Sequence, residues 1–291
     1  MADESQRNSQ SRPSRRPDGS SWPARRAGGS AGGRSGGSAQ RPDRRPSGGR
    51  QDSRGTQQRA GESTRGQTDS GPGGPQISAD IEAKQLAPEI RAELLTLDKT
   101  TADTVARHLV AAGKLLDEDP EAALAHAQAA RTRSGRIAAI REAVGIAAYH
   151  CGDWTQALAE FRAARRMGSK SQLLPIIADC ERGVGRPERA VELSRSPEAA
   201  QLTGDDADEM RIVAAGARAD LGHLEQALAV LSNPLPEPGR TGSTAARLLY
   251  AYADTLVALG REQEAVDWFL RAAAADDEGI TDAEERVGEL S

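Results

Sequence analysis

The sequence predicts an all-α protein, an α-solenoid built from antiparallel helix pairs. Three observations support this fold class: a spacing of glycine and alanine that recurs along the chain, helix-start signals between the repeats, and the lack of alternating Val, Ile or Thr runs. Alanine, the best helix former, dominates the last two thirds of the chain, whereas β-branched and aromatic residues would be expected in strands.

The recurring spacing is a glycine followed five residues later by an alanine. It occurs at Gly152/Ala157, Gly185/Ala190, Gly222/Ala227 and Gly260/Ala265. Ala123 stands in register without its glycine, so that successive alanines are 34, 33, 37 and 38 residues apart. A period of this size is typical of helical solenoids, in which each unit buries its apolar face only against its neighbours.

Composition divides the chain near Gln76. Residues 1–76 contain 14 Arg, 15 Gly, 13 Ser and 7 Pro, and no Val, Ile, Leu, Phe or Tyr. Such a segment buries too little apolar surface to offset an ordering entropy of roughly 1–2 kcal/mol per residue. We therefore expect a disordered basic tail over residues 1–76 and a folded domain over residues 77–291.

The net charge of −5 combines two opposite parts. The tail has 14 Arg against 7 acidic residues, and the remainder has 24 Lys and Arg against 36 acidic residues. An asymmetry of this size suggests an interaction arm attached to an oppositely charged body.

Helix-start signals divide the folded domain into units. A helix is expected over 81–97, ahead of the repeats, with Pro88 best suited to a first turn. Thr100 with Asp103 three residues later resembles a capping box, which predicts that a helix over 105–116 follows.

Similar signals mark the units that come next. Asp119, Pro120 and Glu121 supply a cap, a proline for the first turn and an acid near the positive end of the helix dipole. Asp153 repeats the cap and Pro187 repeats the proline. We therefore expect the chain to alternate between helices and short turns.

Two connections are longer and the last segment is acidic. Residues 194–206 and 232–243 are rich in proline and glycine, and they account for the two longest intervals. Insertions between repeats lie in surface loops. Residues 276–291, in which Thr281 and Glu284 are spaced as a capping box, are expected to form a polar helix that caps the solenoid.

Three further positions share the repeat register. Seven residues before the four glycines stand Gly145, Ala178, Ala215 and Ala253; nine after them stand Phe161, Ser194, Leu231 and Phe269; twelve after them stand Ala164, Pro197, Pro234 and Ala272. This pattern resembles the tetratricopeptide repeat, over roughly residues 105–275. Pro197 and Pro234 depart from it, and we expect the second helices of those two units to end early. An ordinary bundle of antiparallel helices is the alternative arrangement.

The resemblance implies that the first helices of successive units line a concave groove, where a peptide or protein segment would bind. Transfer by register gives these candidate partner-binding residues: Glu142, Tyr149, His150, Asp179, Arg182, Asp220, Arg247, Tyr250 and Asp254. The same transfer adds His108, Leu115, Ile146, Gln172, Glu209 and Ile212. This surface leans acidic, and its tyrosines either anchor a partner or pack between helices. The lysine- and asparagine-rich clamp of family members that grip chaperone tails has no counterpart at the matching positions.

The tail has three interpretations. Its arginines would bind nucleic acid through phosphates in a salt-dependent way, although it lacks Arg-Gly-Gly triplets and offers one stacking ring, Trp22. Alternatively, it lies along the acidic body of the same chain, or it is a solvated linker without a partner.

Catalysis and metal binding find little support. The four histidines are scattered, and His150 and Cys151 are neighbours that point in different directions on a helix. No cofactor, metal or catalytic residue is expected. The two cysteines, with no secretory signal and no long apolar run, predict a cytoplasmic protein. The sequence thus favours a non-catalytic interaction scaffold. An RNA- or ribosome-associated protein that uses the basic tail is the alternative.

Overall fold

The computed structural model describes residues 74–237 and 239–291. Within these residues the fold is all-α: twelve α-helices and three short 3-10 helices follow one another, and no strand is present. The predicted tail over residues 1–76 lies outside the described residues up to residue 73.

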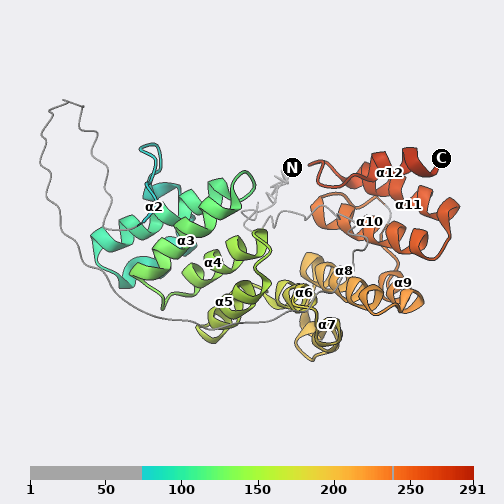
Figure 1. The fold of residues 1–291 in the computed structure, drawn as a ribbon, viewed down its shortest axis with the longest axis horizontal. Coiled ribbons are helices and arrows are strands. Elements are labelled where there is room, and N and C mark those ends of the chain that lie inside the picture. The colour runs from blue at the N-terminus through green and yellow to red at the C-terminus, as the bar shows by residue number, and fades with distance from the viewer. Residues whose placement is uncertain (1–73, 238) are drawn as a thin grey trace, which may run out of the picture.

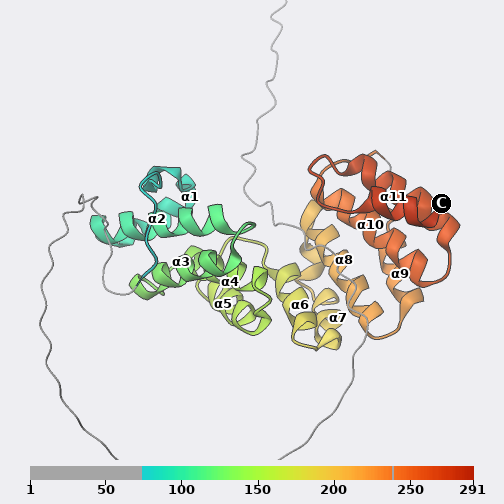
Figure 2. The same ribbon diagram turned by 45° about the horizontal axis from the view of Figure 1, so that its top comes forward.

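The helices come in five antiparallel pairs that follow an arc, with α6 and α7 at its turn and α12 after the last pair (Figure 1). The view in Figure 2 shows the same succession. The pairs are α2 (Lys99–Leu115) with α3 (Pro120–Arg133), α4 (Ala138–His150) with α5 (Trp154–Arg166), α6 (Leu174–Gly183) with α7 (Pro187–Ser194), α8 (Gly204–Asp220) with α9 (Leu224–Ser232), and α10 (Ser243–Ala258) with α11 (Glu262–Ala275). The closing helix is α12 (Ala283–Leu290), and a 3-10 turn, η3 (Ala199–Gln201), follows α7.

The five register alanines occupy equivalent places in the second helix of each pair. Each has an exposed fraction of 0%, and they are Ala123, Ala157, Ala190, Ala227 and Ala265. The four turn glycines also share one conformation, with φ between 74° and 78°. Glycine adopts this left-handed region without the steric cost that a Cβ would bring. The glycine–alanine period is therefore a packing period, as expected.

The segment before the pairs differs from the single helix expected over 81–97. It contains η1 (Ala83–Gln85), then α1 (Pro88–Glu93) and η2 (Leu94–Thr96). Leu86 and Ala87 are extended, with ψ near 140°. The residue before a proline disfavours the α region, which explains the break ahead of Pro88. Leu94 is buried and joins the apolar cluster that covers α2.

Two of the expected caps form and two do not. Asp119 accepts from the N–H of Ala122 at 3.0 Å, and Asp153 accepts from the N–H of Gln156 at 2.9 Å. The predicted box of Thr100 and Asp103 was wrong, because α2 begins at Lys99 and Asp98 accepts from the N–H of Thr101 at 3.0 Å.

The predicted box of Thr281 and Glu284 was also wrong. The carboxylate of Asp276 accepts from the N–H and Oγ1 of Thr281, both at 2.7 Å, and α12 begins only at Ala283. Asp276 thereby satisfies the turn between α11 and α12, which leaves the Thr281 hydroxyl no role as a helix cap.

Small residues permit close approach between neighbouring helices. A Cβ placed on Gly145 would lie 2.7 Å from the ring of Phe161, and one placed on Gly183 would lie 2.4 Å from the ring of Trp154. Real Cβ atoms do not approach other heavy atoms so closely, so both positions require glycine. Gly145 stands seven residues before a turn glycine, so the close contact between α4 and α5 lies at a position of the repeat register.

The two units with a proline at the closing position have short second helices. α7 has 8 residues and α9 has 9, whereas α5 has 13 and α11 has 14. Both short helices end two residues or more before their prolines, as expected, since proline disfavours helix in the residue before it.

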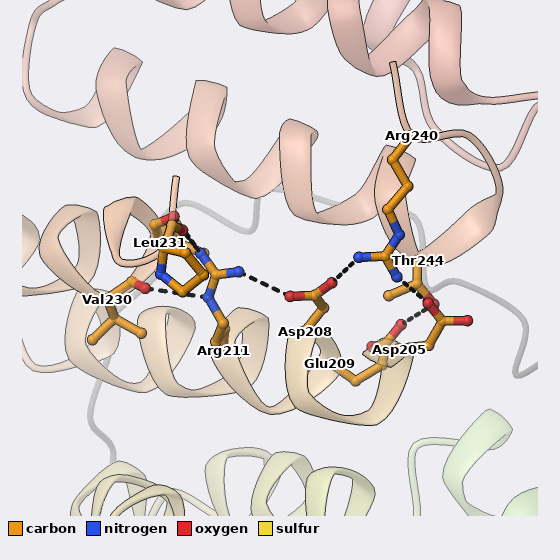
Figure 3. Close-up of polar contacts among 9 residues, drawn as sticks. Asp205, Asp208, Glu209, Arg211, Val230, Leu231, Arg240 and Thr244 are labelled. Carbon is orange, nitrogen blue, oxygen red and sulfur yellow. Dashed lines mark hydrogen bonds and ion pairs between the residues drawn. The ribbon is translucent and has the colours of Figure 1, made fainter. Parts of the chain in front are cut away.

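The long connection after α9 is held against α8 by ionic contacts (Figure 3). The carboxylate of Asp208 accepts from Arg211 at 2.8 Å and also from Arg240, which contacts Asp205 with its other amino group. Arg211 further donates to the carbonyl oxygen of Leu231 at 2.6 Å. Arg211 also donates to the carbonyl oxygen of Pro234, so the loop is attached to the first half of α8 both at Pro234 and at Arg240.

No helix in the described part of the chain combines the length and apolar composition that a membrane crossing needs.

Candidate partner-binding groove

A groove of about 950 Å³ lies on the side of the solenoid formed by the first helices of the pairs. Its polar and aromatic lining comes from α4, α6, α8 and α10, the start of α5 and the turn before α12: Tyr149, Trp154, Asp179, Arg182, Asp220, Arg247, Tyr250, Asp254, Thr281 and Asp282. A smaller pocket of about 60 Å³ shares Tyr149, Asp179 and Arg247 with the groove. We refer to the two together as the groove.

The structure brings together eight of the nine residues that the sequence singled out. These eight line the groove: Tyr149, His150, Asp179, Arg182, Asp220, Arg247, Tyr250 and Asp254. Glu142 is not among the lining residues, and its carboxylate accepts from Ser171 Oγ at 2.7 Å. Whether any of the nine binds a partner stays a prediction.

The residues added by register divide in the same way. Gln172, Glu209 and Ile212 line the groove. His108, in contrast, is buried between α2 and α3, where its Nδ1 lies 3.0 Å from Nδ1 of His126. Its place in the register is that of a groove residue, but in the first unit this position faces the partner helix.

A chain of polar contacts crosses the groove from α4 to α8. Tyr149 Oη donates to Asp179 Oδ2 at 2.5 Å, and Arg182 Nη1 donates to Asp179 Oδ1 at 2.9 Å. Arg182 also binds Asp220 with two nitrogens, at 2.7 and 3.2 Å. A guanidinium that binds a carboxylate with two nitrogens fixes direction as well as distance. The contacts orient side chains from three successive helix pairs.

Arg182 is positioned by a glycine on the neighbouring helix. A Cβ on Gly216 would lie 2.6 Å from the guanidinium carbon and Nη1 of Arg182. The side chain therefore lies flat against the backbone of α8. A larger residue at position 216 would push the guanidinium away from Asp220.

The two tyrosines both pack and line the groove. The ring of Tyr149 meets that of Trp154 edge-on at 5.0 Å, and the ring of Tyr250 meets that of Phe269 edge-on at 5.2 Å. Burial, with a nearby carboxylate in each case, raises the pKa of both phenols far above the usual range. Both hydroxyls therefore stay protonated and act as hydrogen-bond donors.

Burial also perturbs the groove carboxylates. It raises the pKa of Glu209, which Arg247 at 2.8 Å partly offsets. Burial and the neighbouring Asp205 raise the pKa of Asp206, and burial together with Asp282 raises the pKa of Asp254 against the effect of Arg286. Each carboxylate thus lies in surroundings that hold too little positive charge to offset its desolvation.

The histidine at the edge of the groove is neutral near pH 7. Burial lowers the pKa of His150, and Asp117 acts weakly in the opposite direction. Within the described residues no group of three or more His, Cys, Asp or Glu side chains is arranged to hold a metal ion.

Four polar or aromatic lining residues were not assigned to the groove by the sequence analysis: Trp154, Asp206, Thr281 and Asp282. Trp154 both packs on Gly183 and lines the groove. Asp206 and Asp282 follow long turns that break the repeat register. The surplus of acidic residues around Asp206 and Asp282 was the only feature of the sequence that could have indicated their place in the groove.

The repeat pattern has an independent counterpart among known families. Residues 177–278, from α6 to just beyond α11, match the family described as tetratrico peptide repeat. These residues are tetratricopeptide repeats. The matched region contains both proline-interrupted units and the last complete pair, and it includes most of the groove-lining residues.

No curated protein matches the chain. Among solved structures, one titled "Structure of Naa15/Naa10 bound to HypK-THB" is similar to this chain at 13% sequence identity, with a TM-score of 0.29. The similarity covers 69% of this chain and 33% of that chain, so the chain spans about a third of its length.

Proposed function

We propose that the protein is a non-catalytic interaction scaffold that binds a peptide or protein segment in the groove. Tetratricopeptide repeats generally serve protein interaction. The observation that carries the proposal is the origin of the lining: consecutive first helices contribute it, over a volume of about 950 Å³. A groove of this length suits an extended segment better than a compact small molecule.

The lining offers recognition chemistry of two kinds. Tyr149, Trp154 and Tyr250 present aromatic surface at low conformational cost, and tyrosine and tryptophan are enriched among residues that dominate binding energy. Asp179 and Arg182 are held in place by their mutual contacts, so they present charges in fixed directions. Aromatic anchors and preset charges together favour a specific segment over any exposed chain.

A substitution inside the groove tests this function. Ala251 lies on α10 and lines the groove, so Ala251→Arg would fill it without removing a contact. Ala274 is exposed on α11 outside the groove, and Ala274→Arg is the matched control. Arginine is tolerated in helices, so both variants of the full chain are expected to fold.

Tagged full-length protein should capture a defined set of proteins from the cells that produce it. We expect Ala251→Arg to lose this set and Ala274→Arg to keep it, with circular dichroism as the check on folding. If both variants capture the same proteins as the unsubstituted chain, the groove is not the binding surface.

A further inference from the structure

The groove carries an excess of negative charge. Six carboxylates line it: Asp179, Asp206, Glu209, Asp220, Asp254 and Asp282. The arginines in the lining are Arg182 and Arg247, and both are already paired with groove carboxylates. The surplus lies at Asp206 and Asp282, which are exposed, and in part at Asp254, whose side chain is 56% exposed although Arg286 lies 3.6 Å from it.

We propose that the arginines of residues 1–73 bind along this groove in the same chain, so that the N-terminal segment competes with an external partner. The inference rests on the proposed function, because it concerns the same groove. It adds what would occupy the groove, namely a segment that carries arginines. It also adds the source of that segment, which is the same chain.

The segment complements the groove in charge and in chemistry. Residues 1–73 contain 14 Arg, no Lys and 7 acidic residues. A guanidinium binds carboxylates with two parallel hydrogen bonds and stacks on aromatic faces, which an ammonium does less well. The groove offers both features, with exposed carboxylates at Asp254 and Asp282 and with the rings of Tyr149, Trp154 and Tyr250.

The pKa shifts of two groove carboxylates also support the binding of an arginine-bearing segment. Desolvation raises the pKa of Asp206 and of Asp254, Asp205 and Asp282 add to the respective shifts, and Arg286 offsets the shift only in part at Asp254. Both carboxylates therefore have a deficit of compensating positive charge. An incoming guanidinium would reverse that deficit at both positions.

The segment is long enough to reach the groove. Gly74, where it joins the described residues, lies against Ala129 on α3, and a Cβ on Gly74 would be 3.7 Å from that of Ala129. A chain of 73 residues spans up to about 240 Å when extended, several times the size of a domain of this length. Attachment to the same chain gives an effective concentration on the order of millimolar, so individually weak ion pairs suffice.

Photocrosslinking in the full-length protein tests the proposal. The photoreactive residue p-benzoylphenylalanine replaces Ala251 or Ile280, both of which line the groove, and in a control it replaces Leu270, which is 51% exposed on α11. After irradiation, the monomer band is digested and linked peptides are identified by mass spectrometry. We expect peptides from residues 1–73 at both groove positions, at a yield at least about fivefold above that at Leu270.

Charge variants identify the cause of the crosslink. Asp206→Asn with Asp254→Asn removes two groove carboxylates without changing their shape, and about 1 M salt shortens the screening length to about 3 Å. Each should reduce the yield by at least about threefold. The control pair is Glu225→Gln with Asp267→Asn, which removes the same charge from exposed positions on α9 and α11 and should leave the yield unchanged.

Three results would overturn the proposal. One is a yield from residues 1–73 that is no higher in the groove than at Leu270. Another is a crosslinked product at the mass of a dimer, which would place the segment on a second copy. The third is tight binding of added single-stranded RNA, equal in the full chain and in the Asp206→Asn, Asp254→Asn variant, without any groove crosslink.

The test separates this inference from the proposed function. Loss of partner capture by Ala251→Arg, without a groove crosslink, leaves the scaffold function in place and removes only the role of residues 1–73. A groove crosslink without any captured partner supports the binding of residues 1–73 in the groove and counts against the scaffold function.

Discussion

The phenol oxygen of Tyr149 on α4 lies 2.5 Å from Oδ2 of Asp179 on α6, which joins the second helix pair to the third through one hydrogen bond. Asp179 in turn accepts from Arg182, which binds Asp220 on α8. The same contacts that present side chains to the groove therefore also connect its walls. Changes in this chain of contacts are expected to affect both stability and the shape of the groove.

Tyr149→Phe isolates the first link. It removes the hydroxyl and keeps the ring against Trp154, so we expect a loss of about 1 kcal/mol in the free energy of unfolding, measured by urea denaturation. The control is Tyr252→Phe, because the hydroxyl of Tyr252 lies 3.5 Å from Ser232 Oγ and makes a poor hydrogen bond. Equal effects of the two substitutions would show that the Tyr149–Asp179 bond contributes nothing specific.

Two helical glycines should respond to alanine with opposite signs. At Gly183 the new Cβ would meet the ring of Trp154 at 2.4 Å, whereas at Gly113 it would meet nothing within 4 Å. We expect Gly183→Ala to destabilise the protein by about 1–3 kcal/mol through overpacking. Gly113→Ala should stabilise it by up to about 1 kcal/mol through helix propensity. Thermal unfolding measures the change in stability of both variants. A stabilising Gly183→Ala would mean that α5 and α6 are further apart than described.

Much of the fold follows from the sequence because repeat packing imposes a period. Ala157 and Ala265 are fully buried for the same reason, since a second helix must approach its first helix at that point. The register then carries the tyrosines at 149 and 250 into one groove without any knowledge of tertiary contacts. Positions inside the period were therefore predictable.

Positions outside the period were not. The break at Leu86–Ala87 follows from the local effect of Pro88 and not from the repeat period, and Asp98 displaces Thr100 as the cap by a shift of two residues. Asp206, in the first turn of α8, and Asp282, in the turn before α12, follow long connections whose path depends on tertiary contacts, such as those of Arg240 with α8. Glu142 shows the reverse error, because correct register alone does not place a side chain in the groove.

The ionic contacts of the α9–α10 connection should be worth more than surface ion pairs. Asp208 is 7% exposed and serves both Arg211 and Arg240 (Figure 3). We expect Asp208→Ala to cost about 3–5 kcal/mol, because it leaves the half-buried guanidinium of Arg211 without its carboxylate. The control is Arg261→Ala, which breaks the exposed contact with Glu264 and should cost far less, because water and salt screen that pair. Urea denaturation measures both, and comparable losses would show that Asp208 acts as an ordinary surface charge.

The buried pair of His108 and His126 predicts a fall in stability on acidification. Burial, reinforced by Arg133, His126 and Arg107, lowers the pKa of His108 to about 4, and burial also lowers the pKa of His126. An unfolded histidine titrates near pH 6.5, so between about pH 6.5 and pH 4 the unfolded state binds more protons than the folded state. This contribution to stability is present above pH 6.5 and is lost as the pH falls, at up to about 1.4 kcal/mol per pH unit for each histidine.

The two Nδ1 atoms, 3.0 Å apart, can share only one proton, so full protonation of the pair must also break their hydrogen bond. Replacing both residues, as His108→Leu with His126→Leu, should therefore flatten the dependence of the thermal midpoint on pH between 6.5 and 4. Carboxylates that titrate in this range contribute equally to the variant and to the unsubstituted protein, so the difference between the two curves reports the pair. Parallel curves for the double variant and the unsubstituted protein would mean that the imidazoles take up protons as readily in the folded state as in the unfolded state.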